Sequence, residues 1–342
     1  MKRHVNIPIF IPHMGCPNAC VFCNQRSISG KTDFDIMTVE DEIERAVRTI
    51  DYVACDVEIA FFGGSFTGID REDMLYLLGL AKKYVDAGKA QSVRISTRPD
   101  YIDGEILDIL AAHRVTDIEL GLQSLSDRVL SASKRGHTAE QAREACRLIK
   151  ARGFSLVGQM MIGLPQSTLA DELATAREIA ALGCDAARIY PTVVFRDTEL
   201  CDRMNSGLYT PLSMSDAVER AGEVLHIFVR AGIPVIRLGL CAADNLFVPG
   251  TMAGGAYHSA FGELVYGELY WRRMREYIDA HGLAEVIRGK NLTIYVPRGE
   301  VSKASGQKRL NKSRLQNEYN VKNIKIIEND ALVWYNIKME CY

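Results

Sequence analysis

The chain contains 342 residues, and its 41 lysines and arginines nearly balance 43 aspartates and glutamates, leaving a formal net charge of −2. With 47% hydrophobic and 25% charged residues, its composition excludes a disordered or fibrous protein and allows one large domain with a small appendage. No apolar run approaches the roughly 18–20 residues that cross a bilayer, so we expect no membrane association.

We expect no secretory signal at the N-terminus. Pro8 and Pro12 interrupt a short apolar run that is too short for the hydrophobic segment of a signal peptide. The nine cysteines, an odd number, therefore indicate a reducing, cytoplasmic location. In that compartment clustered cysteines more often bind metal or catalyse than form disulfides.

Three cysteines are clustered with the spacing C-x3-C-x2-C, at Cys16, Cys20 and Cys23. A structural zinc site usually needs four protein ligands, so zinc would require a nearby fourth ligand such as His4 or His13. The other interpretation is a [4Fe-4S] cluster held by three thiolates, with one iron left open for another ligand. The remaining six cysteines are expected in the core, because free cysteine behaves as a small hydrophobe.

After the cysteines, strand-like and helix-like patterns alternate along the chain. The predicted strands are Asn6–Ile11, Val57–Phe62, Ser92–Thr97, Thr116–Gly121, Ser155–Ile162 and Ala186–Tyr190. The predicted helices are Val39–Thr49, Arg71–Val85, Gly104–His113, Thr138–Arg152 and Thr168–Leu182. Asp70 and Asp103 are placed as helix N-caps, and Gly153 and Gly183 end helices. The alternation predicts an α/β fold, a partial TIM-like barrel of six βα units with its site at one rim.

Beyond residue 200 the pattern changes. Helices are predicted over Ser213–Ala231 and Ser259–Ala280, with a strand over Ile233–Leu238 and a glycine-rich stretch over 249–256. His258 is a candidate acid/base group at the barrel mouth, and a structural histidine is the alternative. We therefore expect three parts: a core over 1–240, a helical extension closing the barrel over 241–287, and a small α+β domain over 288–342.

The segment 288–325 is strongly basic. It contains ten basic and two acidic residues, a net charge of +8, so the rest of the chain carries −10. Its basic residues are Arg288, Lys290, Arg298, Lys303, Lys308, Arg309, Lys312, Arg314, Lys322 and Lys325. Such charge asymmetry indicates contact with nucleic acid, although a basic solvated face is the alternative.

The same C-terminal region has a recognisable order of elements. The predicted order is strand Leu292–Val296, helix Glu300–Ala304, a turn at 305–308, helix Arg309–Tyr319, strand Asn323–Glu328 and strand Ala331–Ile337. A glycine turn between two helices is similar to a KH module, whose GXXG loop clamps nucleotide backbones. Here Arg309 stands where the second glycine belongs, and a cationic loop suits phosphates.

The motifs in this order resemble the radical S-adenosylmethionine (SAM) superfamily over roughly residues 5 to 200. Its members carry the same cysteine spacing, with an aromatic residue before the last cysteine. The matching runs after the cysteines are Gly63–Gly68, Val93–Asp100, Ile118–Ser124, Lys134–His137, Gln159–Pro165 and Arg188–Thr192. The series is similar to the radical domain of the Elongator catalytic subunit and, less closely, to oxygen-independent coproporphyrinogen oxidase.

The resemblance implies a [4Fe-4S] cluster and SAM as cofactors, with Cys16, Cys20 and Cys23 as thiolate ligands. Electron transfer to SAM would give a 5′-deoxyadenosyl radical that abstracts hydrogen from the substrate, while the protein supplies binding and orientation. Reduced ferredoxin or flavodoxin would be the electron donor. The resemblance also implies the residues that bind SAM.

By resemblance, Gly63, Gly64 and Ser65 hold the SAM amino group, and glycine also allows close backbone approach. Arg135 would pair with the SAM carboxylate through bidentate bonds, and Gln123 would contact the ribose.

Further positions are implied with departures from the family. Gln159 matches a ribose-side position that is acidic in the coproporphyrinogen enzymes, and Ser96 stands where both relatives carry glutamate. Four other residues complete the predicted site: Phe10 and Phe22 as walls around cluster and adenine, and Tyr190 and Arg188 as substrate-side candidates.

Three functions follow. The first is a radical SAM enzyme that modifies RNA, with tRNA as the leading substrate, although the chain leaves no room for the acetyltransferase domain of the Elongator subunit. The second is a radical SAM enzyme acting on a small molecule such as a tetrapyrrole. The third is a non-catalytic RNA-binding metalloprotein.

Overall fold

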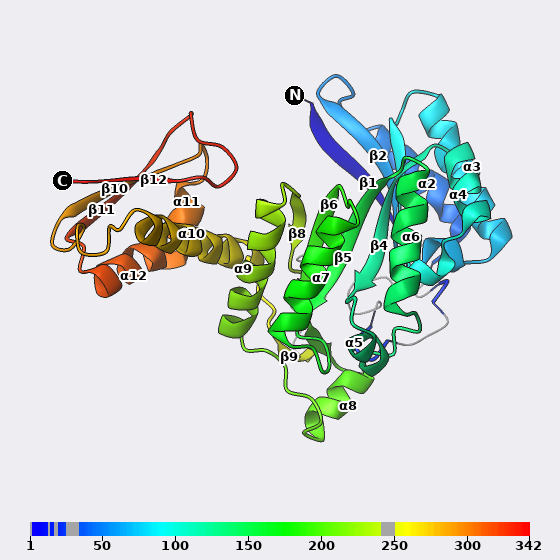
Figure 1. The fold of residues 1–342 in the computed structure, drawn as a ribbon. Helices are drawn as coiled ribbons and strands as arrows, with labels where there is room; N and C mark the ends of the chain where they lie inside the picture. Colours follow the sequence, from blue (N-terminus) through cyan, green and yellow to red (C-terminus); the bar gives the residue numbers. More distant parts are fainter. Residues whose placement is uncertain (1, 13, 17–19, 25–33, 241–249) are drawn as a thin grey trace.

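The computed structural model describes residues 2–12, 14–16, 20–24, 34–240 and 250–342 (Figure 1). Its largest feature is a sheet of seven parallel strands in the order β1-β2-β3-β4-β5-β6-β8. These strands are β1 (Arg3–Ile11), β2 (Cys55–Gly63), β3 (Ser92–Thr97), β4 (Val115–Gln123), β5 (Ser155–Ile162), β6 (Ala186–Pro191) and β8 (Val235–Leu238). The sheet curls into half a barrel, which confirms the predicted α/β partial barrel.

Helices cover the outer face of this sheet. They are α2 (Val39–Val47), α3 (Arg71–Asp86), α4 (Gly104–Ala112), α6 (Ala139–Ala151), α7 (Leu169–Ala181) and α9 (Met214–Arg230), with the short α5 (Asp127–Ala132) at one end (Figure 1). Alternate strand residues such as Ile7, Ile9 and Ile11 are buried in the core that includes these helices. The intervening residues therefore face the inside of the barrel.

Capping residues set the helix boundaries. The carboxylate of Asp70 accepts backbone N–H bonds from Glu72 and Asp73, and Asp103 accepts one from Ile106. Gly153 and Gly183 have positive φ angles of 79° and 75° just after α6 and α7, a conformation that glycine adopts without strain. The predicted caps and stops are confirmed.

The barrel contains one strand more than the six predicted. Residues Val235–Leu238 form β8, which pairs with β6 as the seventh strand of the sheet. Ile236 and Arg237 on β8 are exposed, so the strand lacks the apolar pattern that marks the buried ones. A strand over Ile233–Leu238 was predicted, but not as part of the barrel sheet. A pair of short antiparallel strands, β7 (Val193–Phe195) and β9 (Met252–Gly255), was not predicted.

Residues after 290 form a small module with its own sheet. The order is β11-β10-β12, with β10 (Asn291–Val296) parallel to β11 (Asn323–Glu328) and antiparallel to β12 (Lys338–Cys341). Two helices, α11 (Val301–Ser305) and α12 (Leu310–Tyr319), connect β10 to β11. The predicted α+β appendage is therefore present, with Gly306 between its two helices.

The last predicted strand, Ala331–Ile337, is wrong. Trp334 and Tyr335 have positive φ angles of 53° and 59°, which a strand does not contain. The Trp334 indole N–H donates to the Val229 carbonyl at 2.8 Å, and the Tyr335 ring stacks on Tyr266 with centroids 5.7 Å apart. Tertiary contacts therefore override the local β propensity, and the strand begins at Lys338.

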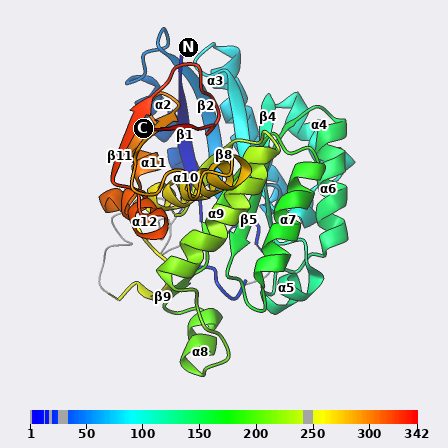
Figure 2. The same cartoon turned by 60° about the vertical axis from the view of Figure 1, so that its left-hand side comes forward.

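The long helix α10 (Phe261–Ala280) carries the module beside the barrel (Figures 1 and 2). Its Tyr270, Trp271 and Met274 are buried in a second core shared with the module. The Arg314 guanidinium also lies 2.8 Å from Glu268 on α10. The first nine residues of the predicted helical extension, 241–249, lie outside the described residues. No helix in the described ranges is long and apolar enough to cross a membrane.

Candidate active site

Several of the predicted site residues lie at one rim of the half barrel. Cys16 follows β1, Gly63 ends β2 and is followed by Gly64, and Gln123 ends β4. Because the strands are parallel, their carboxyl ends share one edge, where barrel enzymes place their active sites. The polar groups described next therefore belong to one site.

The three clustered cysteines lie around a short turn. The Cys23 backbone N–H donates to the Cys20 carbonyl at 3.0 Å; Cys20 is buried, whereas Cys16 and Cys23 are half-buried, and all are free thiols. Within the described ranges, no three His, Cys, Asp or Glu side chains are close enough to form a metal site. The structure thus brings the thiols to one rim without gathering them around a point.

The fourth zinc ligand considered from the sequence is not supplied by His4. His4 lies near the start of β1, at the strand end away from Cys16, where its Nε2 is 2.8 Å from Asn6 and 3.4 Å from Glu58. His13 lies outside the described residues. The other described cysteines pack in or against hydrophobic cores, at Cys55, Cys146, Cys184, Cys201 and Cys341, and Cys241 lies outside the described residues.

Glycine is required where β2 meets the cysteine loop. A Cβ on Gly64 would lie 2.0 Å from the Met14 carbonyl oxygen, and one on Gly63 would lie 2.6 Å from the Ile11 carbonyl oxygen. The Gly64 N–H donates to the Ile11 carbonyl at 2.8 Å, and the Ser65 N–H donates to the Met14 carbonyl at 3.1 Å. The two glycines therefore let the segment before Cys16 cross β2 in close backbone contact.

The side chain of Ser65 is tied into a chain of buried hydroxyls. Its Oγ lies 2.8 Å from Thr97 Oγ1, which lies 2.6 Å from Thr67 Oγ1. It also accepts the backbone N–H of Arg98 at 3.3 Å. The Ser65 hydroxyl is therefore bonded within the protein, as are the backbone N–H groups of Gly64 and Ser65.

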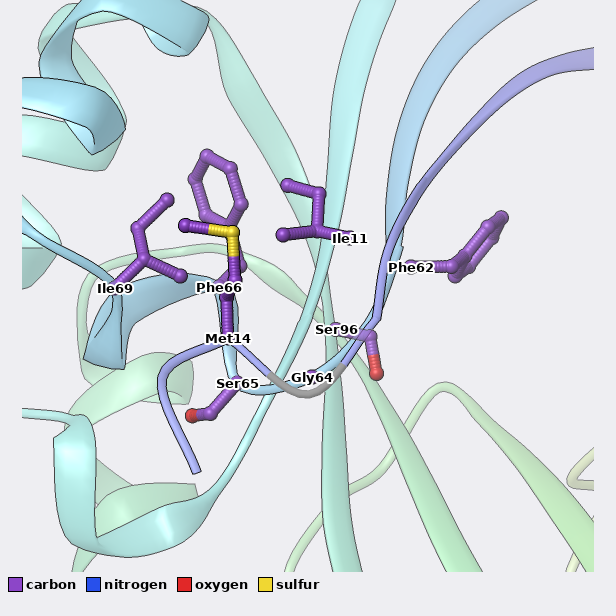
Figure 3. A pocket seen from close by; sticks show the side chains of 8 residues that line it. All are labelled: Ile11, Met14, Phe62, Gly64, Ser65, Phe66, Ile69 and Ser96. Atoms are coloured by element: carbon purple, nitrogen blue, oxygen red, sulfur yellow. The ribbon is translucent and has the colours of Figure 1, made fainter. Parts of the chain in front are cut away.

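A small pocket straddles this turn (Figure 3). Its lining residues are Ile11, Met14, Phe62, Gly64, Ser65, Phe66, Ile69 and Ser96. Phe62 and Ser96 point to one side of the strands, whereas Met14 and Ile11 point to the other. The half-buried Ser96 therefore lies on the barrel side, the same side as the Phe62 ring.

Arg135 and Gln123 carry buried polar atoms that the protein does not satisfy. Arg135 Nη1 donates to Cys20 Sγ at 3.3 Å and Nη2 donates to the Gly121 carbonyl at 2.7 Å. Within the described ranges, Arg135 Nε and Gln123 Oε1 are buried without a hydrogen-bond partner. Gln123 also has a positive φ of 63°. Unsatisfied buried groups are rare in proteins, and here they fit a polar ligand next to Cys20.

Three charged or titratable residues at this rim were missed by the sequence analysis. Arg98 is only 3% exposed, and its Nε and Nη2 donate to the two carboxylate oxygens of Asp100 at 2.9 and 2.8 Å. The buried His137 ring lies 4.0 Å from Asp100. The sequence feature that could have revealed Arg98 and Asp100 is the Arg-Pro-Asp run directly after a predicted strand, because residues at the carboxyl ends of parallel strands commonly bind ligands.

Burial dominates the protonation of these groups. Burial raises the pKa of the Cys16 thiol, and the positive charge of Arg98 opposes this effect. Burial and the neighbouring charge of Arg135 lower the pKa of His137 to about 4, so this imidazole is neutral at pH 7. The Arg98 guanidinium overcomes burial at Asp100, whose carboxyl has a lowered pKa.

The inside of the barrel contains a buried ion network below the rim. Arg94 on β3 lies 3.1 Å from Asp117 and 3.2 Å from Glu119, and Glu119 also pairs with Arg188. Burial raises the pKa of Glu119, and the charges of Arg188 and Arg94 oppose this shift. The predicted substrate-side residue Arg188 is therefore held by an internal carboxylate.

Arg188 also contacts aromatic side chains across the barrel. Its Nη1 lies 3.3 Å from the Tyr190 hydroxyl, and its guanidinium carbon lies 5.6 Å from the centre of the Phe62 ring. Phe10 is 6.0 Å from Phe62, between ring centres. The half-buried Gln159 is paired in register with Arg188. The structure thus groups these five predicted or neighbouring side chains on the barrel interior.

Phe22 and His258 have structural partners. Phe22 packs against a small cluster that contains Val194 and Leu200. His258 Nδ1 accepts the Ala260 backbone N–H at 3.0 Å, directly before α10. This bond fixes the tautomer with hydrogen on Nε2 and favours the structural interpretation of His258.

Sequence comparisons agree with this geometry. The profile of the Radical SAM superfamily matches residues 10–179, and that of the Radical_SAM C-terminal domain matches residues 184–270. Elongator complex protein 3 of Homo sapiens is 31% identical over 191 residues, which cover 50% of this chain and 35% of that protein. The tRNA uridine(34) acetyltransferase of Methanocaldococcus jannaschii is 27% identical over 248 residues, covering 66% of this chain and 43% of that protein. The chain thus spans less than half of either relative.

Solved structures show the same fold. The Elp3 of Methanocaldococcus infernus superposes with a TM-score of 0.59 and 22% identity, covering 83% of this chain and 64% of that one. Coproporphyrinogen III oxidase of Escherichia coli gives 0.50 and 18%, covering 68% of this chain and 53% of that one. These likenesses show the fold. The matched profiles over residues 10–179 and 184–270 establish that the chain belongs to the radical SAM superfamily, whose enzymes use a [4Fe-4S] cluster and S-adenosylmethionine.

Proposed function

We propose that this radical SAM enzyme modifies an RNA substrate of the tRNA type. The observation that carries the proposal is the set of basic side chains on the C-terminal module that form no salt bridge with any described residue. The names of relatives add support, since one is a tRNA uridine(34) acetyltransferase. Membership of an enzyme superfamily removes the support for a non-catalytic metalloprotein.

Different residues of the site would bind the cluster and the separate groups of SAM. Cys16, Cys20 and Cys23 would hold the cluster, and the backbone at Gly63 and Gly64 would meet the SAM amino group. The Arg135 Nε–H donor, which has no partner among the described residues, suits the SAM carboxylate. The Gln123 Oε1 acceptor, likewise without a described partner, suits the SAM ribose. When bound, the cofactors supply the electron and the 5′-deoxyadenosyl radical that abstracts hydrogen.

The barrel interior would then orient the substrate. Arg188 presents a guanidinium that is already fixed by Glu119 and Tyr190, so little side-chain entropy would be lost on binding. Phe10 and Phe62 supply an apolar wall on the opposite strands. In this proposal His258 stabilises the turn before α10 through its bond from the Ala260 backbone N–H, and it is not an acid/base group.

The basic module supplies the RNA contact. Among its ten basic residues between 288 and 325, ion pairs are formed by Arg288 with Glu285, Lys303 with Glu300 and Arg314 with Glu268. Seven others have no salt bridge within the described part of the chain: Lys290, Arg298, Lys308, Arg309, Lys312, Lys322 and Lys325. Unneutralised cations release counterions from phosphates on binding and so favour a polyanion.

The loop between α11 and α12 is the part of this surface that we assign to phosphates. Lys308 and Arg309 are exposed and have positive φ angles of 53° and 62°, next to Gly306. Side chains other than glycine adopt this conformation at a cost of about 1–3 kcal/mol, and such strain gathers at ligand clamps. The KH-like interpretation of this loop thus remains part of the proposal.

Binding of bulk tRNA to the full chain tests the RNA substrate. We expect the logarithm of the binding constant to fall linearly with the logarithm of salt concentration, because each phosphate contact releases counterions. Binding that is absent, or insensitive to salt, would exclude the RNA proposal.

Reduced ferredoxin or flavodoxin is our proposed electron donor, and a cytoplasmic location agrees with the eight described cysteines being free.

The second candidate is a radical SAM enzyme for a small polar molecule such as a tetrapyrrole. The guanidinium of Arg188 inside the barrel favours it, since a substrate carboxylate could bind there. This candidate requires no contact with the basic module. Turnover of a small substrate by a chain in which Lys308 and Arg309 are replaced would support it.

A further inference from the structure

Arg98 is a buried cation that the predicted site leaves unexplained. It directly follows β3, and it holds Asp100 through Nε and Nη2 at 2.9 and 2.8 Å. Nη2 also donates to the Arg135 backbone carbonyl. These bonds fix the guanidinium in one orientation, with Asp100 on one edge.

The other edge of this guanidinium is unsatisfied. Arg98 Nη1 is buried and has no hydrogen-bond partner within the described residues. Leaving a charged donor unpaired away from water costs more than the roughly 1–3 kcal/mol of a neutral one, so such a group needs an explanation. Burial opposes the charge of Arg98, but its pKa is raised by Asp100 and, to a smaller extent, by Cys20 and Cys16. The unpaired donor therefore belongs to the surroundings of two predicted cluster ligands.

Arg98 is also connected to the other side of the predicted site. Its backbone N–H donates to Ser65 Oγ at 3.3 Å, and Arg135, whose carbonyl it binds, donates to Cys20 Sγ at 3.3 Å. One residue thus links the glycine turn, the Arg135 loop and the cysteine loop. A displacement of Arg98 would therefore move the glycine turn, the Arg135 loop and the cysteine loop.

We propose that Arg98 is a positioning residue that tunes the reduction of the [4Fe-4S] cluster, with Asp100 as its counter-charge. The proposal rests on the assignment of Cys16 and Cys20 as cluster ligands. Reduction adds one negative charge to the cluster, and a fixed cation nearby stabilises that added charge. Asp100 opposes the effect, because its carboxylate destabilises the same negative charge.

The alternative is that Arg98 and Asp100 only clip the loop after β3 in place. The two roles predict different signs. A structural clip is broken equally by removal of either partner, so both variants would change the cluster in the same direction. An electrostatic role requires opposite shifts, because one variant removes a positive charge and the other a negative charge.

The test is the midpoint potential of the cluster in the reconstituted full chain, followed by electron paramagnetic resonance during a redox titration. We expect Arg98→Gln to lower the potential, Asp100→Asn to raise it, and Arg98→Lys, which keeps the charge, to stay near the wild type. The control is Arg128→Gln. This substitution removes the ion pair that Arg128 forms with Asp171 at 2.7 Å, and it should leave the midpoint potential unchanged.

Shifts of the same sign in Arg98→Gln and Asp100→Asn, or no shift in either with the cluster assembled, would overturn the proposal. If Arg98→Gln fails to fold, Asp100→Asn and Arg98→Lys still decide the sign. A wild-type chain that assembles no cluster would instead refute the ligand assignment itself. Loss of tRNA binding would leave this inference untouched, since the measured quantity is a potential.

Discussion

The barrel rim and the C-terminal module handle polar groups in opposite ways. At the rim, Arg98, Arg135 and Gln123 are buried, and each has an atom without a hydrogen-bond partner among the residues that the structure describes. In the module, the buried Asn311 donates to the Gly267 and Ala304 carbonyls at 2.7 and 3.1 Å, and the unpaired charges are on the surface. We therefore expect the rim to bind a ligand at a buried, fixed site, and the module to bind a ligand in competition with salt.

This difference predicts how the two regions respond to substitution. Changes at the rim remove interactions in a low-dielectric site and should have large, local effects on the cluster. Changes on the module remove screened surface charges and should have smaller effects that depend on ionic strength.

The largest effect is expected from Cys20→Ala. Loss of a cluster ligand should reduce SAM cleavage by roughly 100-fold or more, since even residues that only support a ligand alter activity by about 10–100-fold. The readout is 5′-deoxyadenosine formed under anaerobic reducing conditions. Cys55→Ala is the matched control, because Cys55 is also buried but lies at the start of β2, at the opposite end of the barrel. Retained cleavage in Cys20→Ala would contradict the ligand assignment.

A pH effect on stability is expected from His137. Its pKa is about 4 in the folded chain, against about 6.5 when exposed, so the unfolded state binds more protons between these values. Stability should therefore fall as pH falls from 6.5 to 4, by up to about 3 kcal/mol from this residue. Comparing urea unfolding of the wild type and His137→Gln at pH 7 and pH 4.5 measures the difference. An equal pH dependence in both would show that His137 is not the group responsible.

Gly64→Ala should disrupt the crossing of the cysteine loop over β2. The added Cβ would lie 2.0 Å from the Met14 carbonyl oxygen, so backbone must move. We expect destabilisation by about 1–3 kcal/mol, typical of overpacking, with loss of cluster assembly. Gly79→Ala on α3 is the control, since a Cβ there meets nothing within 4 Å. A neutral Gly64→Ala would show that the loop does not approach β2 this closely.

A smaller, salt-dependent effect is expected from replacing both Lys308 and Arg309 with alanine. If each contacts one phosphate, the slope of log binding constant against log salt should decrease by about 1 to 2. Filter binding of tRNA at several salt concentrations measures it. The control pair, Lys82→Ala with Lys83→Ala, removes two lysines of α3 that already pair with Asp86 and Glu40. Equal slopes in both double variants would place the RNA contact elsewhere.

The sequence predicts the periodic parts of the fold well. The strands Ser92–Thr97 and Ser155–Ile162 were predicted with the observed bounds, because alternating or continuous apolar patterns report burial directly. The strand over 331–337 failed because Trp334 and Tyr335 bind residues of α9 and α10, far away in sequence.

The same difference between local patterns and long-range contacts applies to the candidate site. The order of strands predicted that Gly64 and Gln123 belong to one rim, since parallel strands end together, and the family resemblance implied Arg135 as a further site residue. Neither predicted Arg98, whose burial and bond to the Arg135 carbonyl depend on two loops meeting. The resemblance implied that Ser65 helps to hold the SAM amino group, and the structure adds that its hydroxyl lies 2.8 Å from Thr97 Oγ1. Short-range patterns thus locate the site, and long-range contacts decide what each side chain does.

Transfer of deuterium into 5′-deoxyadenosine tests the central claim most directly. The full chain, with its cluster reconstituted, is incubated with SAM, a reductant and perdeuterated bulk tRNA, and the 5′-deoxyadenosine is analysed by mass spectrometry. The account predicts deuterium in the product, because the radical abstracts hydrogen from RNA. Product without deuterium from tRNA, together with label from a deuterated small-molecule pool, would contradict it.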